Sequence, residues 1–218
     1  MSRHLYGFRD ISHIRDQFDP TSLEEVVFPS ERSEIYLKRW VSRSPTTRNL
    51  LLYGSPGTGK TRAAYQLALA RTDGTEEWDP IRYTECESGV ADKLLQQLKD
   101  EVFAFPKISH PDFEAVVILD EVDNFKPDQQ KHLKKVMERS DLTFILLTNH
   151  INRLDEGIKD RCYAIPWQLP NFEGCKERIR VLTENAGHRD LDETILRRIY
   201  TSGGWRQILR NIETFSIE

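Results

Sequence analysis

The fold of this chain is decided by residues 49–70, which read NLLLYGSPGTGKTRAAYQLALA. An apolar run leads into a glycine-rich turn and then into good helix formers, so the spacing predicts a strand, a loop and a helix. The alternation recurs with the runs IRYTE, AVVILDE and TFILLTN, at residues 81–85, 115–121 and 143–149. Apolar runs without polar alternation are typical of strands buried on both faces of a parallel sheet. The sequence therefore predicts a three-layer α/β fold with a parallel sheet.

Helical spacing fills the segments between these strands and dominates the end of the chain. Residues 91–105 and 129–139 are predicted helices, whereas residues 158–167 are interpreted as part of a polar turn region. After Pro170, glycines separate three further stretches of helical spacing. The predicted boundaries are 1–170 for the α/β domain, with 1–45 as its N-terminal segment, and 171–218 for a small all-helical lid domain.

The amino-acid composition argues against several classes of protein. The 218 residues are 38% hydrophobic and 30% charged with a net charge of −4, which argues against disorder and against a uniformly basic nucleic-acid coat. Neither the three cysteines nor the six histidines show metal-ligand spacing. Because the sequence has no apolar leader and no run of about 18 apolar residues, we expect a soluble cytoplasmic protein without a membrane partner.

Residues 54–61, GSPGTGKT, match the phosphate-binding pattern GxxxxGK[ST] without a mismatch. Glycines let successive backbone N–H groups point at a phosphate, and the helix that follows adds partial positive charge. We expect Lys60 to reach the β- and γ-phosphates of a nucleotide and the Thr61 hydroxyl to ligate Mg²⁺. The alternative is a glycine-rich turn at a helix start, which the order of strand, loop and helix argues against. The predicted nucleotide-binding residues of this stretch are Gly54, Ser55, Pro56, Gly57, Thr58, Gly59, Lys60, Thr61 and Arg62.

Two other predicted strands end in polar side chains. In AVVILDE, Asp120 would hold Mg²⁺ and Glu121 would polarise the attacking water, although acids at a strand end are often only helix caps. Asn149 ends TFILLTN, and its amide would stand near the γ-phosphate if the two strands were neighbours; otherwise it is a polar strand terminator. Ligands of parallel sheets bind outside the carboxyl ends of the strands, so we expect these groups to meet the glycine-rich loop.

The order of these motifs resembles that of the AAA+ ATPases, a branch of the P-loop NTPases, and within them the clamp-loader subunits. The likeness covers nearly the whole chain. Its remaining elements are DQQKHLKKVMERS at 128–140, FDPTSLEEVVFP at 18–29, Asp160-Arg161-Cys162, and Gly203-Gly204-Trp205-Arg206. The resemblance implies a prokaryotic or viral subunit that binds ATP with Mg²⁺ and hydrolyses it at subunit interfaces during DNA replication.

The resemblance also implies roles for single residues. Arg161 corresponds to an arginine finger that reaches the ATP of the adjacent subunit in trans, although the residues alone favour a solvated Asp-Arg pair. Arg206 corresponds to the sensor 2 arginine of the lid, and Val27 lies in the adenine-side segment. The predicted catalytic residues are thus Glu121, Asn149, Arg161 in trans and Arg206, and the predicted metal ligands are Thr61 and Asp120.

Three departures from the family pattern affect these expectations. The second strand ends in Thr84-Glu85-Cys86, where cellular clamp loaders commonly carry Asn-Ala-Ser, so the sequence lacks the usual residues of the polar switch that restrains the catalytic glutamate. Asp160 replaces a serine and is expected to hold Arg161 until a neighbour docks. The family's helical collar is absent from these 218 residues, so we expect ATP-bridged contacts with AAA+ neighbour subunits to drive assembly.

The family's partners are primed DNA and a sliding clamp. Basic residues of the 126–139 stretch, first Lys126 and Lys131, together with the segment near Ser88 and Gly89, would track the DNA backbone; the alternative is a solvated helix face. Two other functions stay open. One is a helicase loader or origin initiator of the same family, and the other is a non-catalytic, nucleotide-gated scaffold subunit.

Overall fold

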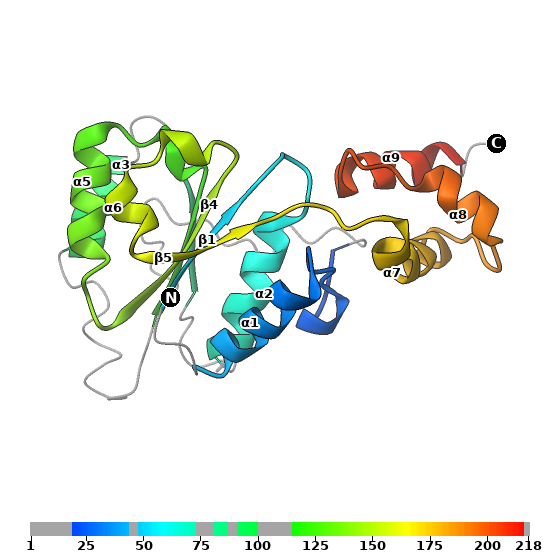
Figure 1. The fold of residues 1–218 in the computed structure, drawn as a ribbon, viewed down its shortest axis with the longest axis horizontal. Helices are drawn as coiled ribbons and strands as arrows, with labels where there is room; N and C mark the ends of the chain where they lie inside the picture. The colour runs from blue at the N-terminus through cyan, green and yellow to red at the C-terminus, as the bar shows by residue number, and fades with distance from the viewer. Residues whose placement is uncertain (1–18, 44–47, 73–80, 87–90, 100–114, 216–218) are drawn as a thin grey trace, which may run out of the picture.

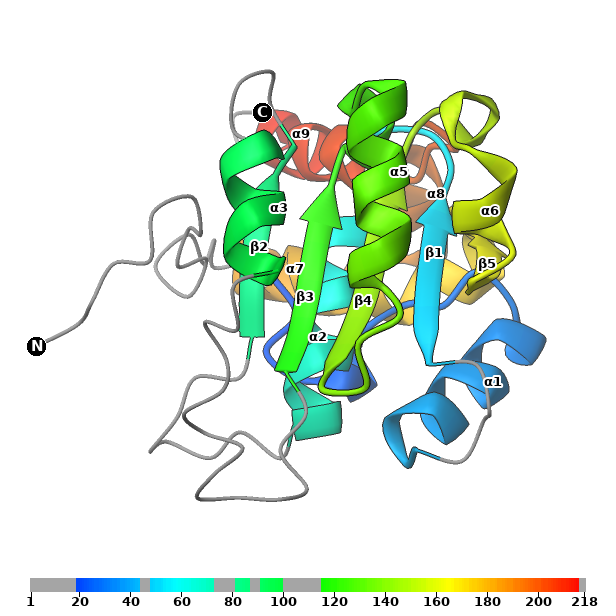
Figure 2. The ribbon, with the colours of Figure 1, turned by 90° about the vertical axis from the view of Figure 1, so that its left-hand side faces the viewer.

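A computed structural model describes residues 19–43, 48–72, 81–86, 91–99 and 115–215 of the chain. Its centre is a five-stranded sheet with the order β2-β3-β4-β1-β5, in which every neighbouring pair is parallel (Figure 2). The strands are β1 (Asn49–Tyr53), β2 (Ile81–Glu85), β3 (Ala115–Asp120), β4 (Leu142–Thr148) and β5 (Cys162–Pro166). The predicted parallel α/β fold is confirmed.

The central strands contain continuous apolar runs because both faces of the sheet are covered. Val117 and Leu146 belong to a hydrophobic cluster on one face, and Ile118 and Leu147 to a second cluster on the other. Helices α3 and α5 lie over the first face, and α2 lies over the second (Figure 2). The bounds of the helices beside the sheet are α1 (Glu31–Val41), α2 (Lys60–Thr72), α3 (Ala91–Lys99), α5 (Pro127–Val136) and α6 (Glu156–Lys159).

Residues 162–166 correct one expectation, because the region interpreted as a polar turn contains strand β5. It pairs with β1 along one edge of the sheet. Ala164 and Pro166 of this strand are exposed, so β5 lacks the continuous apolar run that marks a central strand. Proline is tolerated in a sheet mainly on edge strands, where its missing N–H breaks no ladder bond. The helix predicted to extend to residue 105 is described only to Lys99, and its remainder lies outside the described residues.

The C-terminal helices form a separate layer beside the sheet (Figure 1). They are α7 (Phe172–Asn185), α8 (Glu193–Ile199) and α9 (Trp205–Phe215). Cys175, Ile179, Leu196, Ile208 and Ile212 are buried between them in a cluster distinct from those of the sheet. None of the described helices combines the length and apolar character that crossing a membrane requires. The described part of the chain also contains the short 3-10 turns η1 (Leu23–Glu25), η2 (Val122–Asn124) and η3 (Ile151–Arg153).

Candidate functional site

The glycine-rich loop connects the end of β1 to the start of α2, as the motif predicts. Among its glycines, Gly57 and Gly59 have φ of 76° and 88°, values that other residues rarely adopt. The loop curls so that the Lys60 ammonium returns to its start and donates to the carbonyls of Gly54 and Ser55, each at 2.8 Å. The loop therefore folds around the Lys60 side chain.

Lys60 also joins two strands. Its ammonium donates to Asn149 Oδ1 at 2.9 Å, because β4 lies beside β1 in the sheet and Asn149 follows β4 directly. Lys60 is buried, and burial lowers its pKa, while the carboxylates of Asp120 and Asp123 act in the opposite direction. The sequence expectation that Asn149 meets the loop depended on this strand neighbourhood, and the sheet order provides it.

Thr61 and Asp120 face each other at the carboxyl edge of the sheet. The Thr61 hydroxyl donates to Asp120 Oδ2 at 2.7 Å, and Asp120 Oδ1 accepts from the Glu121 N–H at 2.8 Å. A hydroxyl and a carboxylate are oxygen ligands of the kind that Mg²⁺ binds together with water and phosphate. Within the described part of the chain, three or more acidic, histidine or cysteine side chains nowhere gather into a metal-binding group. Mg²⁺ is commonly held by one or two protein carboxylates, with phosphate and water as further ligands.

Glu121 has a backbone conformation that few glutamates adopt. Its φ and ψ are 54° and 40°, in the left-handed region, where a side chain is strained. The conformation turns the chain sharply at the end of β3, and Asn124 donates to Glu121 Oε2 at 3.1 Å. Strain of this kind is found where the surrounding structure holds a functional side chain in place. The carboxylate is exposed at the cavity described next.

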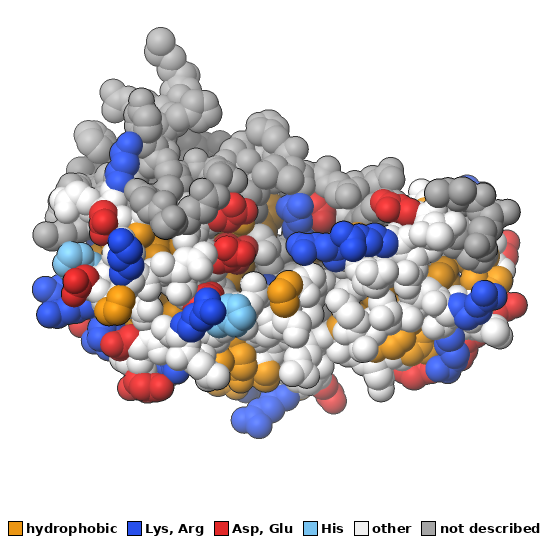
Figure 3. Space-filling model, turned by 90° about the horizontal axis from the view of Figure 1, so that it is seen from above, with side chains coloured by type: hydrophobic (Ala, Val, Ile, Leu, Met, Phe, Trp, Pro, Cys, Tyr) orange, Lys and Arg blue, Asp and Glu red, His pale blue; other side chains and the backbone are white. Residues whose placement is uncertain are grey.

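A cavity of about 570 Å³, here called the edge cavity, opens at the carboxyl ends of the strands. Seen from this side of the molecule, acidic and basic side chains stand next to one another in the middle of the face (Figure 3). The predicted residues that line the edge cavity are Pro56, Gly57, Gly59, Lys60, Thr61, Arg62, Asp120, Glu121, Asn149 and Arg206. The structure thus brings residues from four separate stretches of sequence to one cavity.

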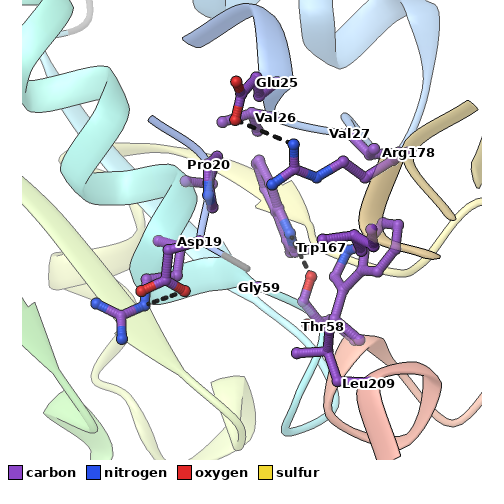
Figure 4. Close-up of a pocket in the computed structure, with 14 residues that line it drawn as sticks. Asp19, Pro20, Glu25, Val26, Val27, Thr58, Gly59, Trp167, Arg178 and Leu209 are labelled. Atoms are coloured by element: carbon purple, nitrogen blue, oxygen red, sulfur yellow. Dashed lines mark hydrogen bonds and ion pairs between the residues drawn. The ribbon is translucent and has the colours of Figure 1, made fainter. Parts of the chain in front are cut away.

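A second hollow, here called the tryptophan pocket, adjoins the edge cavity and has a volume of about 80 Å³. Val27 lines it, together with the apolar faces of Trp167, Trp205, Leu182 and Leu209 (Figure 4). Gly59, Arg62 and Trp205 border both hollows, so the two lie next to each other. The Trp167 indole donates to the Thr58 carbonyl at 3.1 Å and is only 1% exposed. A flat apolar group would find hydrophobic walls in the tryptophan pocket next to the polar edge cavity.

Two ion pairs border the tryptophan pocket and tie the N-terminal segment to both parts of the fold. Arg178 on α7 meets Glu25 at 3.0 Å, and Arg62 on α2 meets Asp19 at 3.0 Å (Figure 4). The Thr21 N–H and then Arg178 lower the pKa of Glu25, against the effect of its partial burial. Residues 19–27 therefore close one side of the pocket.

Helix α9 begins directly against the glycine-rich loop. The Arg206 N–H donates to the Gly57 carbonyl at 3.4 Å, and a Cβ on Gly204 would lie only 2.7 Å from that carbonyl oxygen. Trp205 covers Gly59, where an added Cβ would lie 3.1 Å from the indole. Arg206 is exposed and lines the edge cavity, so the C-terminal helices contribute to the cavity.

Arg161 lies apart from the edge cavity, beyond the end of α6. Its guanidinium donates to the Gly157 carbonyl at 2.8 Å and forms an ion pair with Glu138 at 3.0 Å. The expectation that Asp160 holds this arginine is wrong: Glu138, two residues after the end of α5, is the acid that does so. The Arg161 side chain is 37% exposed, which leaves it reachable from outside the chain.

The basic stretch forms α5 and the residues around it. Lys126 and Lys131 are exposed, whereas Lys134 pairs with Asp155 at 2.8 Å and Arg139 pairs with Asp141 at 2.6 Å. A groove of about 520 Å³ runs between α3 and α5, and its lining includes His132 and Lys135. Ser88 and Gly89, which were expected to share a nucleic-acid face with this helix, lie outside the described residues.

Sequence reasoning missed three side chains of the edge region: Tyr83, Glu85 and Asp123. The Tyr83 hydroxyl lies 3.3 Å from Glu85 Oε1 and 3.4 Å from Asp120 Oδ2. Burial, and then the charges of Asp120 and Glu85, raise the pKa of Tyr83, so its hydroxyl stays a proton donor. Period-two spacing in IRYTE puts Tyr83 and Glu85 on one face of β2, but their approach to Asp120 depends on the pairing of β2 with β3. Thr84, which stands where cellular clamp loaders commonly carry asparagine, is buried on the other face, at 2% exposure.

The fold and the loop define a P-loop nucleotide-binding architecture. The family model described as "ATPase family associated with various cellular activities (AAA)" matches residues 50–166, more than half of the chain. The chain belongs to this AAA family.

Curated relatives with similar sequences are small subunits of replication factor C. The small subunit 2 of Pyrobaculum islandicum is 32% identical over 206 residues, which cover 91% of this chain and 62% of that protein. The small subunit of Archaeoglobus fulgidus is 31% identical over 193 residues, covering 87% of this chain and 59% of that protein. The chain thus spans about three fifths of the length of these relatives.

Solved structures share the fold at lower sequence identity. The Holliday junction branch migration motor RuvB of Thermotoga maritima superposes with a TM-score of 0.66 at 18% identity, covering 91% of this chain and 65% of that one. Domain III of the replication initiation protein DnaA of the same organism gives 0.63 at 16% identity, covering 90% of this chain and 86% of that one. At such identities the likeness concerns the fold.

Proposed function

We propose that this chain is an ATP-binding and ATP-hydrolysing subunit of a clamp-loader-type complex that acts in DNA replication. The observation that carries the proposal is the convergence of Lys60, Thr61, Asp120, Glu121 and Asn149 at one cavity. Relatives that are 31–32% identical over most of the chain are subunits of replication factor C, which supports the clamp-loader assignment over other members of the family.

In the proposed complex the nucleotide lies across both hollows. The adenine fits between the apolar walls of the tryptophan pocket, where Val27 contributes, and the phosphates fit the edge cavity. Lys60 would exchange its bonds to the Gly54 and Ser55 carbonyls for phosphate oxygens, and loop N–H groups would add further donors. Thr61 and Asp120 would hold Mg²⁺, which neutralises charge on the phosphates when bound.

For hydrolysis, Glu121 is the proposed general base that accepts a proton from the attacking water. Asn149 would orient that water from the other side. Its side chain already lies at the glycine-rich loop, where its amide oxygen accepts a hydrogen bond from Lys60 at 2.9 Å. Arg206 would contact the nucleotide from the C-terminal helices in cis. Arg161 would leave Glu138 and reach the phosphates bound by an adjacent subunit, which makes hydrolysis depend on assembly.

The proposed partners follow from the same assignment: AAA+ neighbour subunits, a sliding clamp and primed DNA, in the cytoplasm of a prokaryotic or virus-infected cell. Exposed Lys126 and Lys131 on and beside α5 would contact DNA phosphates without reading sequence. The fold likeness to DnaA domain III and RuvB favours a second candidate, an initiator or another DNA motor of the family. Because these two structures are only 16–18% identical to this chain in sequence, we rank this candidate second.

One experiment tests the ATPase assignment. Lys60→Ala is expected to weaken ATP binding at least about 100-fold, because it removes two or more charge-assisted hydrogen bonds to phosphate. Glu121→Gln is expected to keep binding and to lose turnover. Glu184→Gln makes the same change at an exposed site outside both hollows and serves as the control. Fluorescent-nucleotide titration measures binding, and phosphate release measures turnover. Hydrolysis by Glu121→Gln at the wild-type rate would refute the assignment.

A second experiment tests whether hydrolysis takes place at subunit interfaces. Mixing Arg161→Ala with Lys60→Ala is expected to restore part of the hydrolysis, since each hybrid interface combines an intact arginine with an intact loop. A strictly linear loss across the mixing ratios argues against a finger in trans. Joint stimulation of hydrolysis by primed DNA and a clamp supports clamp loading, whereas stimulation by a replicative helicase alone supports the runner-up.

A further inference from the structure

A buried hydrogen bond connects the two loops that carry Glu121 and Asn149. The Thr148 hydroxyl, at the end of β4, donates to Asp123 Oδ1 at 2.6 Å across 25 residues of sequence. The Asp123 side chain is only 5% exposed, and Thr148 is 1% exposed. Asp123 Oδ2 lies 3.7 Å from the guanidinium of Arg153, a longer contact. The Thr148 hydroxyl is thus the close partner of a buried carboxylate.

The same hydroxyl also fixes the backbone beyond Asn149. Thr148 Oγ1 accepts a hydrogen bond from the His150 N–H at 2.8 Å while it donates its proton to Asp123. Asn149 is therefore held from both sides, by strand β4 before it and by the His150 N–H after it. Its side chain reaches Lys60 from a backbone with little freedom to turn.

At its other end the hydrogen bond holds the loop of Glu121. Asp123 belongs to η2, for which Glu121 is the N-terminal capping residue, and Asn124 of the same turn contacts the Glu121 carboxylate at 3.1 Å. Glu121 occupies the left-handed region, which persists only where neighbouring structure enforces it. The Asp123–Thr148 bond ties this turn to the neighbouring strand β4.

We propose that Asp123 and Thr148 are positioning residues for hydrolysis, whose hydrogen bond sets the separation of Glu121 and Asn149 on either side of the attacking water. The inference rests on the proposed ATPase function. Neither residue lines the edge cavity, so both act through Glu121 and Asn149. Small displacements of groups that orient a reactant are sufficient to slow the chemical step about 100-fold.

A purely structural role makes a different prediction. A buried carboxylate that loses its donor destabilises the fold, whereas replacing both partners by apolar side chains removes that penalty. If the hydrogen bond served stability alone, the double variant Asp123→Leu/Thr148→Val would regain both stability and turnover. If it positions Glu121 and Asn149, the double variant regains stability and stays slow.

The experiment compares Thr148→Val, Thr148→Ser and the double variant in the full chain, with the neighbour subunits and DNA that support the highest wild-type rate. For Thr148→Val we expect kcat to fall about tenfold or more, while the Kd for ATP changes less than about threefold. Thr148→Ser keeps the hydroxyl and is expected to recover most of kcat. Thermal unfolding of each variant is recorded in parallel.

Each outcome decides the inference. A slow double variant with wild-type thermal stability and ATP affinity supports positioning. Recovery of kcat in the double variant, no benefit of Thr148→Ser over Thr148→Val, or equal losses of binding and turnover would overturn it. If the wild-type assembly hydrolyses no ATP, the proposed function fails and the inference falls with it. A wild-type rate in Thr148→Val overturns the inference alone.

Discussion

Replacing Gly204 by alanine is expected to push helix α9 away from the glycine-rich loop. The new Cβ would lie 2.7 Å from the Gly57 carbonyl oxygen and 2.9 Å from its carbon, closer than heavy atoms tolerate. Gly204 also has φ of 102°, which strains any residue with a Cβ by about 1–3 kcal/mol. Because both atoms in the clash belong to backbone, neither can rotate away. The strain is relieved only if the two segments separate.

Separation removes Trp205 and Arg206 from the edge cavity, so ATP binding should weaken. If the whole strain of about 1–3 kcal/mol opposes binding, the affinity falls about 5-fold to 150-fold. If part of the strain remains in the free protein, the melting temperature falls by about 2–4 °C for each kcal/mol, as expected for a domain of this size. The loss of ATP affinity and the fall in melting temperature should together account for the strain energy of Gly204→Ala.

Gly203→Ala is the matched control, since the neighbouring glycine would make only ordinary contacts. Its Cβ would lie 3.6 Å from the Thr201 hydroxyl and 3.8 Å from the Gln207 Cβ, and its φ is not positive. Fluorescent-nucleotide titration and thermal unfolding of both variants test the reasoning. Equal affinity and equal melting temperature for Gly204→Ala, Gly203→Ala and wild type would show that the contact between α9 and the loop is not what the structure implies.

Two further predictions concern the N-terminal segment and the thiols. Because the folded pKa of Glu25 is lowered, its stabilising effect is present above its unfolded pKa of about 4.3 and is lost as the pH falls through the folded value. Glu25→Gln should therefore melt below wild type at pH 7, and the difference should shrink as the pH is lowered below about 4. A melting difference that stays the same across this range would contradict this. Burial raises the pKa of Cys162 to about 12 and that of Cys175 to about 11, so iodoacetamide at pH 8 should label both only after unfolding. Rapid labelling of the native chain would contradict that expectation.

The local sequence pattern was sufficient to predict the central strands and the glycine-rich loop. Strands β1, β3 and β4 contain continuous apolar runs because helices cover both faces of the sheet, and such a run is visible in consecutive residues. The glycines of residues 54–61 likewise indicate a backbone conformation that other residues rarely adopt. Strand β5 was not predicted because it lies at an edge of the sheet. There Ala164 and Pro166 are exposed, and no continuous apolar run is needed. Tyr83 and Glu85 were not predicted because their importance depends on the neighbouring strand.

The sequence by itself determined the strand–loop–helix unit and the residue types able to bind phosphate and Mg²⁺, because these depend on spacing within a few residues. Tertiary structure alone decided which of these groups meet. Asn149 reaches Lys60 across 89 residues because β4 lies between β3 and β1, and strand order has no signature in local spacing. Glu138 rather than Asp160 holds Arg161 because α5 packs beside α6. Which of several nearby acids reaches a cation is set by helix packing, a property of the whole fold.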